Sequence, residues 1–424
     1  MNTNHLIEAI KAGKYDALLC DVYVDESLLE FQKARYIQAI EKFVELYGEK
    51  DVEIYSAPGR SEVGGNHTDH QHGEVLAAAI NLDVIGVVAR KDDSIKVLSD
   101  NFDINAVNIH ELDIVDSEKG SSEALIRGVV SRFKELGLAV GGFEGYFTSQ
   151  VLMGSGLSSS AAFEVLIGTI LSGLYNDQTV SPVEIAKIGQ YAENVYFDKP
   201  CGLMDQCASS VGGLIHIDFK DPQVPVVEAV DVDFSKFEHS LCIVDTKGDH
   251  ADLTPEYAAV PAEMKAVANF FGKSFLREVD EADFIKNIPA IQAKCGDRAV
   301  LRAGHLFGEN KRVQQQVATL KSGDFEGFKK ALVASGNSSY KYLQNVFASS
   351  DVQSQGVSLG IMMSEYILQD HGVVRVHGGG FAGTIQAFVQ DEFVSTYKNE
   401  IEKIFGKDAC YVLKVRKYGG KRII

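Results

Sequence analysis

Apolar residues recur at helical spacing between positions 27 and 47, and Gly48 follows them. This pattern predicts an amphipathic helix that ends at the glycine. Further helices are predicted at 121–137, 158–175, 182–197, 255–271, 297–320, 324–346 and 353–369. Short apolar and β-branched runs predict strands at 52–57, 84–89, 95–98, 143–149, 213–218, 240–245, 373–377, 384–389 and 410–415. Since helices and strands do not alternate regularly, the pattern favours an α+β protein over a doubly wound sheet.

The length of the chain indicates two domains. It has 424 residues, and single hydrophobic cores stop growing at about 250–300 residues. After Asp218, the stretch Phe219–Pro225 carries Lys, Asp and Pro without apolar periodicity. We therefore expect an N-terminal domain over 1–220 and a C-terminal domain over 221–424.

The charge balance bears on the choice of partner. With 41 Lys and Arg against 59 Asp and Glu, the net charge is −18. Such a field repels polyanions, so we expect neither nucleic acid nor an anionic membrane as a partner. A small phosphate donor remains compatible, because a local pocket of backbone N–H groups binds it whatever the net charge.

The cysteines and the N-terminus indicate a cytoplasmic protein. Six cysteines are scattered along the chain, with no CxxC pair and no zinc-type spacing. The first residues lack a basic segment followed by an apolar run, and no apolar stretch approaches the ~20 residues of a membrane helix. The oligomeric state stays open.

The strongest local signal runs from Met153 to Ala162, MGSGLSSSAA, between a predicted strand and an apolar helix. Small residues let the backbone approach a phosphate closely, and the N–H groups and dipole of the helix start favour negative charge. The serine hydroxyls can cap the helix or reach a metal. A glycine turn before a capped helix is the alternative interpretation of this segment alone.

A second segment, Ser56–His70, sets polar groups against glycines between two apolar strands. Such packing suits a small hydroxylated ligand better than a solvated loop. An alternative takes His67, Asp69, His70 and His72 as metal ligands, but their spacing matches no zinc pattern.

Two further segments contain polar residues or several glycines. One contains Glu193 and then Pro200–Cys207, where Asp205 lies near Gly202 in a run that otherwise resembles core. This carboxylate is a candidate base or orienting group for a substrate hydroxyl, or alternatively an N-terminal helix carboxylate. The other segment, Val376–Gly383, VHGGGFAG, suits a phosphate-side or substrate-side loop.

Together these segments resemble the GHMP kinase superfamily and, within it, the galactokinase family. The family pattern A-P-G-R-x-x-x-x-G-E-H-T-D-Y is matched at Ala57, Pro58, Gly59, Arg60, Gly65, His67, Thr68 and Asp69. The patterns G-x-G-L-S-S-S-A, C-G-x-M-D-Q and G-G-G-F-x-G are complete at 154–161, 201–206 and 378–383. A weaker similarity at Arg302–His305 and Glu309 extends the resemblance over most of the chain from about residue 29.

The resemblance implies a two-domain α+β GHMP kinase fold, with ATP in the cleft between the domains and Mg²⁺ bridging its phosphates. It implies a galactokinase-type sugar 1-kinase, which phosphorylates D-galactose at the anomeric hydroxyl to give galactose 1-phosphate. By the same resemblance Asp205 is the catalytic carboxylate with Arg60 beside it, and Ser160 and Glu193 hold the metal. The other implied contacts are with ATP, at Gly154, Ser155, Gly156, Leu157, Ser158, Ser159 and Ser160, and with the sugar, at Asn66, His67, Asp69, Gly202 and Tyr257.

Two departures from the family pattern fall in the sugar-contacting segment. Asn66 stands where the family has Glu, and His70 where it has Tyr. Loss of a charged hydrogen bond, worth about 1.5–3 kcal/mol, would weaken galactose binding or admit another sugar. The alternatives are therefore a kinase for galacturonate, arabinose or N-acetylgalactosamine, or a non-catalytic sugar and ATP sensor. Intact Ser160, Asp205 and Arg60 favour catalysis over the sensor.

Overall fold

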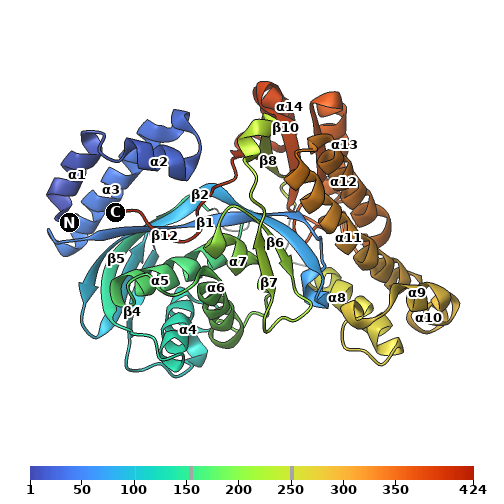
Figure 1. The fold of residues 1–424 in the computed structure, drawn as a ribbon, viewed down its shortest axis with the longest axis horizontal. Coiled ribbons are helices and arrows are strands. Elements are labelled where there is room, and N and C mark those ends of the chain that lie inside the picture. Colours follow the sequence, from blue (N-terminus) through green and yellow to red (C-terminus); the bar gives the residue numbers. More distant parts are fainter. Residues whose placement is uncertain (101, 152–155, 249–252) are drawn as a thin grey trace.

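The computed structural model describes residues 1–100, 102–151, 156–248 and 253–424. Within these residues, the strands form two sheets, and helices pack against both (Figure 1). The predicted α+β class is confirmed.

The larger sheet has eight described strands in the order β12-β1-β2-β5-β3-β4, with β6 paired to β2 and β7 paired to β6. Its pairs are antiparallel except for β3 with β5. The strands are β1 (Glu53–Gly64), β2 (Glu74–Lys91), β3 (Ser94–Ser99), β4 (Phe102–Asn108), β5 (Gly142–Ser149), β6 (Leu214–Asp218), β7 (Val226–Ala229) and β12 (Lys421–Arg422).

Helices cover both faces of this sheet. In Figure 1 the N-terminal helices lie above it and α4 to α7 below it. Neighbouring residues of β2 accordingly enter different cores: Ile85 and Val87 pack with the N-terminal helices, whereas Val84 and Val88 pack with α5. The helices are α1 (Thr3–Lys11), α2 (Asp16–Tyr23), α3 (Leu29–Tyr47), α4 (Ser122–Glu135), α5 (Ser159–Tyr175), α6 (Pro182–Tyr191), the π-helical turn η4 (Ala192–Tyr196) and α7 (Met204–Val211).

The N-terminal helices also hold a buried polar cluster centred on Asp83. Its carboxylate accepts hydrogen bonds from Tyr23 at 2.8 Å, from Arg35 at 2.6 Å and from Arg416 at 2.9 Å. A buried carboxylate needs such partners to remain charged. Helix α2, helix α3 and the C-terminal segment are therefore joined at one point of the sheet.

The smaller sheet has four described strands in the order β11-β8-β10-β9. Its apolar face packs against α13 and α14, and α12 lies beside β9. The strands are β8 (His239–Asp245), β9 (Gly372–Val376), β10 (Thr384–Gln390) and β11 (Cys410–Leu413). The helices of this half are α8 (Thr254–Phe270), α9 (Glu281–Lys286), α10 (Ile288–Cys295), α11 (Asp297–Ser322), α12 (Phe325–Ser338), the π-helical turn η7 (Ser339–Leu343), α13 (Gly356–Leu368) and α14 (Val394–Phe405).

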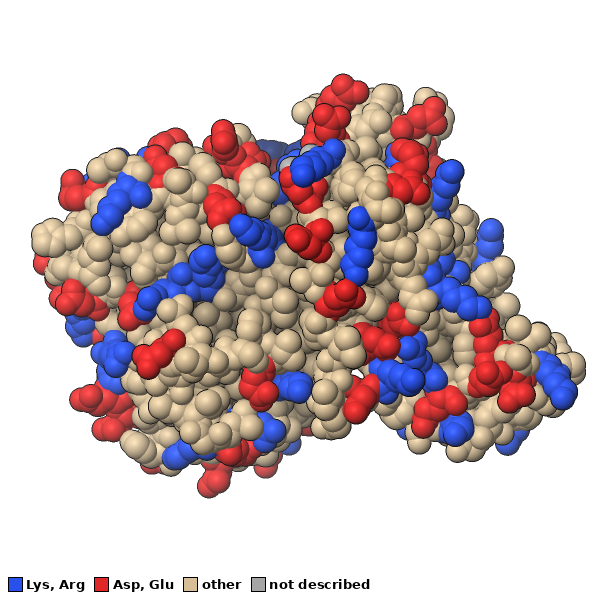
Figure 2. Space-filling view, in the orientation of Figure 1, with Lys and Arg blue, Asp and Glu red and all other residues tan. Residues whose placement is uncertain are grey.

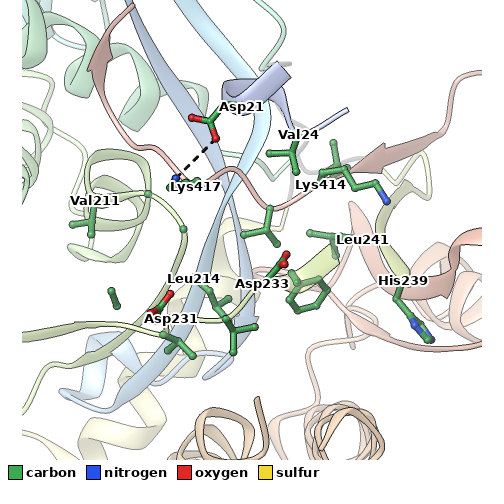
Figure 3. A pocket seen from close by; sticks show the side chains of 18 of the residues that line it. Asp21, Val24, Val211, Leu214, Asp231, Asp233, His239, Leu241, Lys414 and Lys417 are labelled. Atoms are coloured by element: carbon green, nitrogen blue, oxygen red, sulfur yellow. Dashed lines mark ion pairs between the residues drawn. The ribbon is translucent and has the colours of Figure 1, made fainter. Parts of the chain in front are cut away.

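The chain crosses between the two sheets after β7, and it returns after β11 to place β12 beside β1. The expected division at 220/221 falls inside the β6–β7 hairpin of the larger sheet. A cavity of about 1020 Å³ lies at the crossing (Figure 3). It is lined by Cys20 and Asp21 of α2, by residues 211–214 and 229–234, and by residues 413–415 and Lys417. Asp21 and Lys417 face each other across it at 3.9 Å. None of its lining residues belongs to the four motifs.

The charged surface is mixed on the face seen in Figure 2, where acidic and basic side chains are interspersed. No helix in the described ranges combines the length and the apolar character needed to cross a membrane.

Candidate active site

Strand β1 brings Arg60 against the glycine and serine loop that precedes α5. The Arg60 N–H donates to the Leu157 carbonyl at 3.1 Å, and its guanidinium donates to the Gly156 carbonyl at 2.6 Å. Gly59 allows this approach, because a Cβ there would lie 2.9 Å from the Leu157 oxygen. The first two motifs are thus joined through their backbones.

Arg60 also forms a bidentate ion pair with Asp205, which lies in the first turn of α7. Its Nε lies 2.6 Å from Asp205 Oδ1, and a terminal nitrogen lies 2.7 Å from Oδ2. Ser158 adds a third bond, with its hydroxyl 2.5 Å from Oδ2. The Ser158 backbone has a φ of 58°, a left-handed conformation that is uncommon outside glycine and frequent at functional turns.

These contacts set the charge of the carboxylate. Burial raises the pKa of Asp205, but the charge and hydrogen bonds of Arg60 and the hydrogen bond of Ser158 outweigh it, so the pKa is lowered. Asp205 is therefore ionised at neutral pH. Its side chain keeps 33% of its surface exposed, whereas that of Arg60 keeps 10%. An ionised carboxylate is thus presented to solvent with its guanidinium partner buried behind it.

A second carboxylate faces the start of α5. Glu193 lies in η4, and such π-helical turns inside helices occur frequently at functional sites. Its Oε1 accepts hydrogen bonds from the Ser160 hydroxyl at 3.2 Å and from Lys199 Nζ at 3.1 Å. Its Oε2 accepts one from Gln206 at 2.9 Å. One carboxylate and one hydroxyl, close together, can serve as oxygen ligands for a hard cation such as Mg²⁺.

Glu164 lies behind this group and was missed by the sequence analysis. Gln206 Nε2 donates to Glu164 Oε2 at 3.0 Å as well as to Glu193. Burial and the charge of Glu193 raise the pKa of Glu164 well above its ordinary value, so we expect a neutral carboxyl group. The one signal in the sequence was a charged residue in the middle of an apolar helix.

On the sugar-contacting side, Asp69 and Gly202 lie together. A Cβ at residue 202 would lie too close to Asp69 Oδ2, so a larger residue there would displace the Asp69 carboxylate. Burial raises the pKa of Asp69, His67 lowers it, and the charge of Asp205 raises it further, with a raised pKa as the result. The two carboxylates are therefore electrostatic neighbours, an arrangement suited to a ligand rich in hydroxyl groups.

The glycine loop of the fourth motif closes against the second motif. His67 Nε2 lies 2.9 Å from the Gly379 carbonyl, and the Tyr257 hydroxyl donates to the Gly380 carbonyl at 2.8 Å. His67 Nδ1 lies 3.3 Å from His70 Nε2. Burial, together with the neighbouring His67, lowers the pKa of His70 to about 3, so this ring is neutral.

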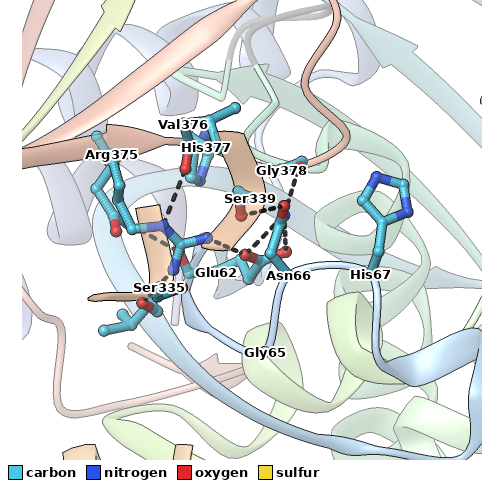
Figure 4. Close-up of polar contacts among 12 residues, drawn as sticks. Glu62, Gly65, Asn66, His67, Ser335, Ser339, Arg375, Val376, His377 and Gly378 are labelled. Carbon is cyan, nitrogen blue, oxygen red and sulfur yellow. Dashed lines mark hydrogen bonds and ion pairs between the residues drawn. The ribbon is translucent and has the colours of Figure 1, made fainter. Parts of the chain in front are cut away.

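Asn66 is fully buried, and its carboxamide bonds within the protein (Figure 4). Its nitrogen donates to the Gly378 carbonyl at 2.6 Å and to Glu62 at 3.2 Å. Its oxygen accepts hydrogen bonds from Asn345 at 2.8 Å and from Ser339 at 3.2 Å. A sugar contact for Asn66 stays a prediction, and it requires the carboxamide to exchange one of these partners.

Glu62 is the second carboxylate that the sequence analysis missed. It pairs with Arg375 at 2.6 Å, and both side chains are buried between β1 and β9. The negative charge that the family pattern has at position 66 is therefore absent there, but a carboxylate lies within hydrogen-bond distance of Asn66. The signal was a charged residue two positions after Arg60, in a stretch not predicted to be a strand.

Not every candidate residue is placed at this site. Gly154 and Ser155 lie outside the described residues. His72 stacks on Phe275, with the ring centroids 3.6 Å apart. In the described part of the chain, no three His, Cys, Asp or Glu side chains are grouped to hold a metal.

Comparison with known proteins matches two ranges of the chain that contain three of the four motifs. Residues 41–90 match the family model "Galactokinase galactose-binding signature", and residues 124–213 match "GHMP kinases N terminal domain". A galactokinase of Actinobacillus pleuropneumoniae serotype 3 is 31% identical over 386 residues, which cover 87% of this chain and 93% of the relative. A galactokinase of Streptomyces coelicolor is 30% identical over 368 residues, covering 86% and 92%.

Solved structures agree on the fold. The crystal structure of Lactococcus lactis galactokinase complexed with galactose superposes with a TM-score of 0.76 at 24% identity, over 90% of this chain and 98% of that one. A mevalonate kinase superposes with a TM-score of 0.60 at 16% identity, over 86% and 99%. The expected GHMP kinase fold is confirmed.

Proposed function

The chain belongs to the galactokinase family, and on that premise we propose that it transfers the terminal phosphoryl group of ATP to the anomeric hydroxyl of D-galactose. The products are galactose 1-phosphate and ADP. The observation that carries the proposal is the convergence of Arg60, Asp205 and Ser158 beside the loop that leads into α5. A guanidinium, an ionised carboxylate and a helix start are what phosphoryl transfer to a hydroxyl requires.

Asp205 orients the attacking hydroxyl. Its carboxylate is ionised and partly exposed, so it can accept a hydrogen bond from the sugar. Because Arg60 lowers its pKa, Asp205 is a weak base, and we expect it to take the proton only after bonding to phosphorus is under way. Phosphoryl transfer depends chiefly on positioning and on neutralising charge, and Arg60 contributes to both.

The start of α5 forms the phosphate-binding side. Gly156, Leu157, Ser158 and Ser159 lead into the helix, whose first N–H groups favour an anion. Gly154 and Ser155 belong to the same proposed cradle. Ser160 follows one residue into the helix and turns its hydroxyl to Glu193.

Ser160 and Glu193 are the proposed ligands of Mg²⁺. The fit is good for this ion, which commonly takes one or two carboxylates together with substrate phosphates and water. When bound, Mg²⁺ would neutralise charge on the phosphates. Gln206 holds the second oxygen of Glu193, which keeps its first oxygen directed at Ser160.

The proposed sugar contacts are Asp69, Gly202, His67, Tyr257 and Asn66. Asp69 and Gly202 lie together near Asp205. His67 and Tyr257, 190 positions apart in the chain, both contact the glycine loop. Carboxylate and imidazole groups next to exposed backbone are suited to the several hydroxyl groups of a hexose.

The proposed location is the cytoplasm, and the proposed partners are the sugar and ATP. All six cysteines are free thiols, as is usual in a reducing compartment.

A sugar panel tests the proposal. Purified protein, Mg²⁺ and ATP are combined with galactose, galacturonate, arabinose or N-acetylgalactosamine, and ADP release is followed. We expect the highest kcat/KM with galactose, because substrates are discriminated by their transition-state binding. Turnover of another sugar in the absence of galactose turnover would overturn the assignment, and tight binding of ATP and galactose without turnover would indicate a sensor.

A further inference from the structure

Lys199 is a cation that does not belong to the family motifs. It lies beside Glu193, the carboxylate proposed to bind Mg²⁺. It lies on the segment between η4 and α7, and its Nζ is 3.1 Å from Glu193 Oε1. Ser160 donates to the same oxygen. The ammonium group therefore stands at the carboxylate oxygen that is proposed to bind Mg²⁺.

The backbone around Lys199 is held by hydrogen bonds, whereas its side chain, apart from the ion pair with Glu193, is largely exposed. The Lys199 N–H donates to the Glu193 carbonyl at 3.1 Å, and the Cys201 N–H donates to the Asn194 side chain at 2.7 Å. The side chain of Lys199 is 61% exposed, against 3% for Glu193. The flexible four-carbon stem can therefore turn once Glu193 has another partner, while its point of attachment stays in place.

The electrostatics of the site indicate where the Lys199 side chain would turn. A dication on Glu193 and Ser160 would repel the ammonium group and take over its partner. The other carboxylate whose charge acts on Lys199 is Asp205, which Arg60 already pairs. Phosphates held at this site would then be the anions available to the ammonium group. Arg60 cannot neutralise all of the negative charge of the phosphates, because two of its nitrogens are bonded to Asp205.

Resting on the proposed function, we infer that Lys199 is a further phosphate-binding residue. It occupies the metal-binding oxygen of Glu193 in the absence of nucleotide and turns to a phosphate oxygen of ATP when the metal binds. The exchange needs no change of the backbone, and it leaves the sugar-contacting residues untouched.

The matched variants are Lys199→Gln and Lys119→Gln. Lys119 pairs with Asp198, the residue before Lys199, at 3.5 Å and with Asp116 at 3.1 Å. Its replacement therefore removes one carboxylate-bound ammonium from the same neighbourhood without touching Glu193 or Ser160. Lys199→Arg keeps the charge and serves as the conservative variant.

Two measurements test the exchange. Calorimetry with Mn²⁺ as the probe and no nucleotide should show tighter binding to Lys199→Gln than to the unaltered protein, by about threefold or more, because a competitor is gone. With Mg²⁺ present, the KM for ATP should rise about tenfold, as for loss of one charge-assisted hydrogen bond, while the KM for galactose stays within twofold. Lys199→Arg should regain most of the ATP affinity, and Lys119→Gln should match the unaltered protein in both assays.

The outcomes separate this inference from the proposed function. Unchanged Mn²⁺ affinity or an unchanged KM for ATP in Lys199→Gln would overturn the inference, as would equal effects in Lys119→Gln. Failure of the unaltered protein to turn over galactose would instead overturn the proposed function. The Mn²⁺ titration does not depend on the identity of the sugar.

Discussion

Replacement of Arg60 by lysine would keep the positive charge but not its geometry. Three different nitrogens of Arg60 bond to Asp205 Oδ1, to Asp205 Oδ2 and to the Gly156 carbonyl, at 2.6, 2.7 and 2.6 Å. A single ammonium nitrogen cannot reach all three acceptors, so we expect two of these bonds to be lost. The carboxylate and the loop would then no longer be fixed relative to each other.

The size of the effect follows from those two bonds. Hydrogen bonds to charged groups are worth about 1.5–3 kcal/mol each, so their loss amounts to about 3–6 kcal/mol. Each 1.36 kcal/mol of transition-state stabilisation is about tenfold in rate. Bonds made equally before and during the transition state do not affect kcat, so the summed free energy is an upper limit. We expect kcat to fall by about 100-fold or more, but by less than that limit implies. ADP release at saturating ATP and galactose measures this, and a kcat within threefold of the unaltered protein would refute the reasoning.

Arg127 offers a matched control. It forms the same bidentate pair, with Glu118 at 2.8 and 2.7 Å, and gives its third bond to the Glu111 carbonyl. Both arginines are 8% exposed. Arg127→Lys should lower the melting temperature by an amount similar to Arg60→Lys but leave kcat unchanged. A similar loss of kcat in both variants would mean that general destabilisation, not the active-site geometry, causes the effect.

Further predictions concern charge and acid stability. Asp205→Asn should lower the rate constant at least about 100-fold in single-turnover assays, and because it leaves the buried Arg60 without its counter-charge we also expect a lower melting temperature. Arg375→Met leaves its carboxylate partner buried without a counter-charge, so urea unfolding should show a loss of about 3–5 kcal/mol, and a loss below about 1 kcal/mol would contradict the pairing. Burial raises the pKa of Glu309, but the charges of His305, Arg312 and Arg375 lower it to about 2 from 4.5. This carboxylate therefore adds on the order of 3 kcal/mol above pH 4.5 that is lost as the pH falls toward 2, and Glu309→Gln should flatten that part of the unfolding free energy against pH.

Local pattern was sufficient for the elements with strong periodicity. The helix predicted over 158–175 is α5, and the strand predicted over 143–149 lies within β5. The prediction for 84–89 was too short, because β2 extends over 74–91. Its alanines and glycine carry little strand signal, and only burial between two helical layers makes them a strand. Short or weakly periodic elements, such as α9, β7 and β12, were missed because tertiary packing decides them.

The glycine and serine loop, Arg60 and Asp205 could be identified from the amino-acid sequence, together with their order along the chain. Close approach of the backbone and the start of a helix demand particular residue types, and within each motif these residues are neighbours in the chain. The tertiary structure alone decided their partners. Asp205 pairs with a residue 145 positions earlier in the chain, Asn66 binds the side chain of Asn345, and His67 Nε2 lies at the Gly379 carbonyl. Such contacts depend on which faces of distant elements the fold brings together. The spacing of residues along the chain does not encode which distant residues will meet.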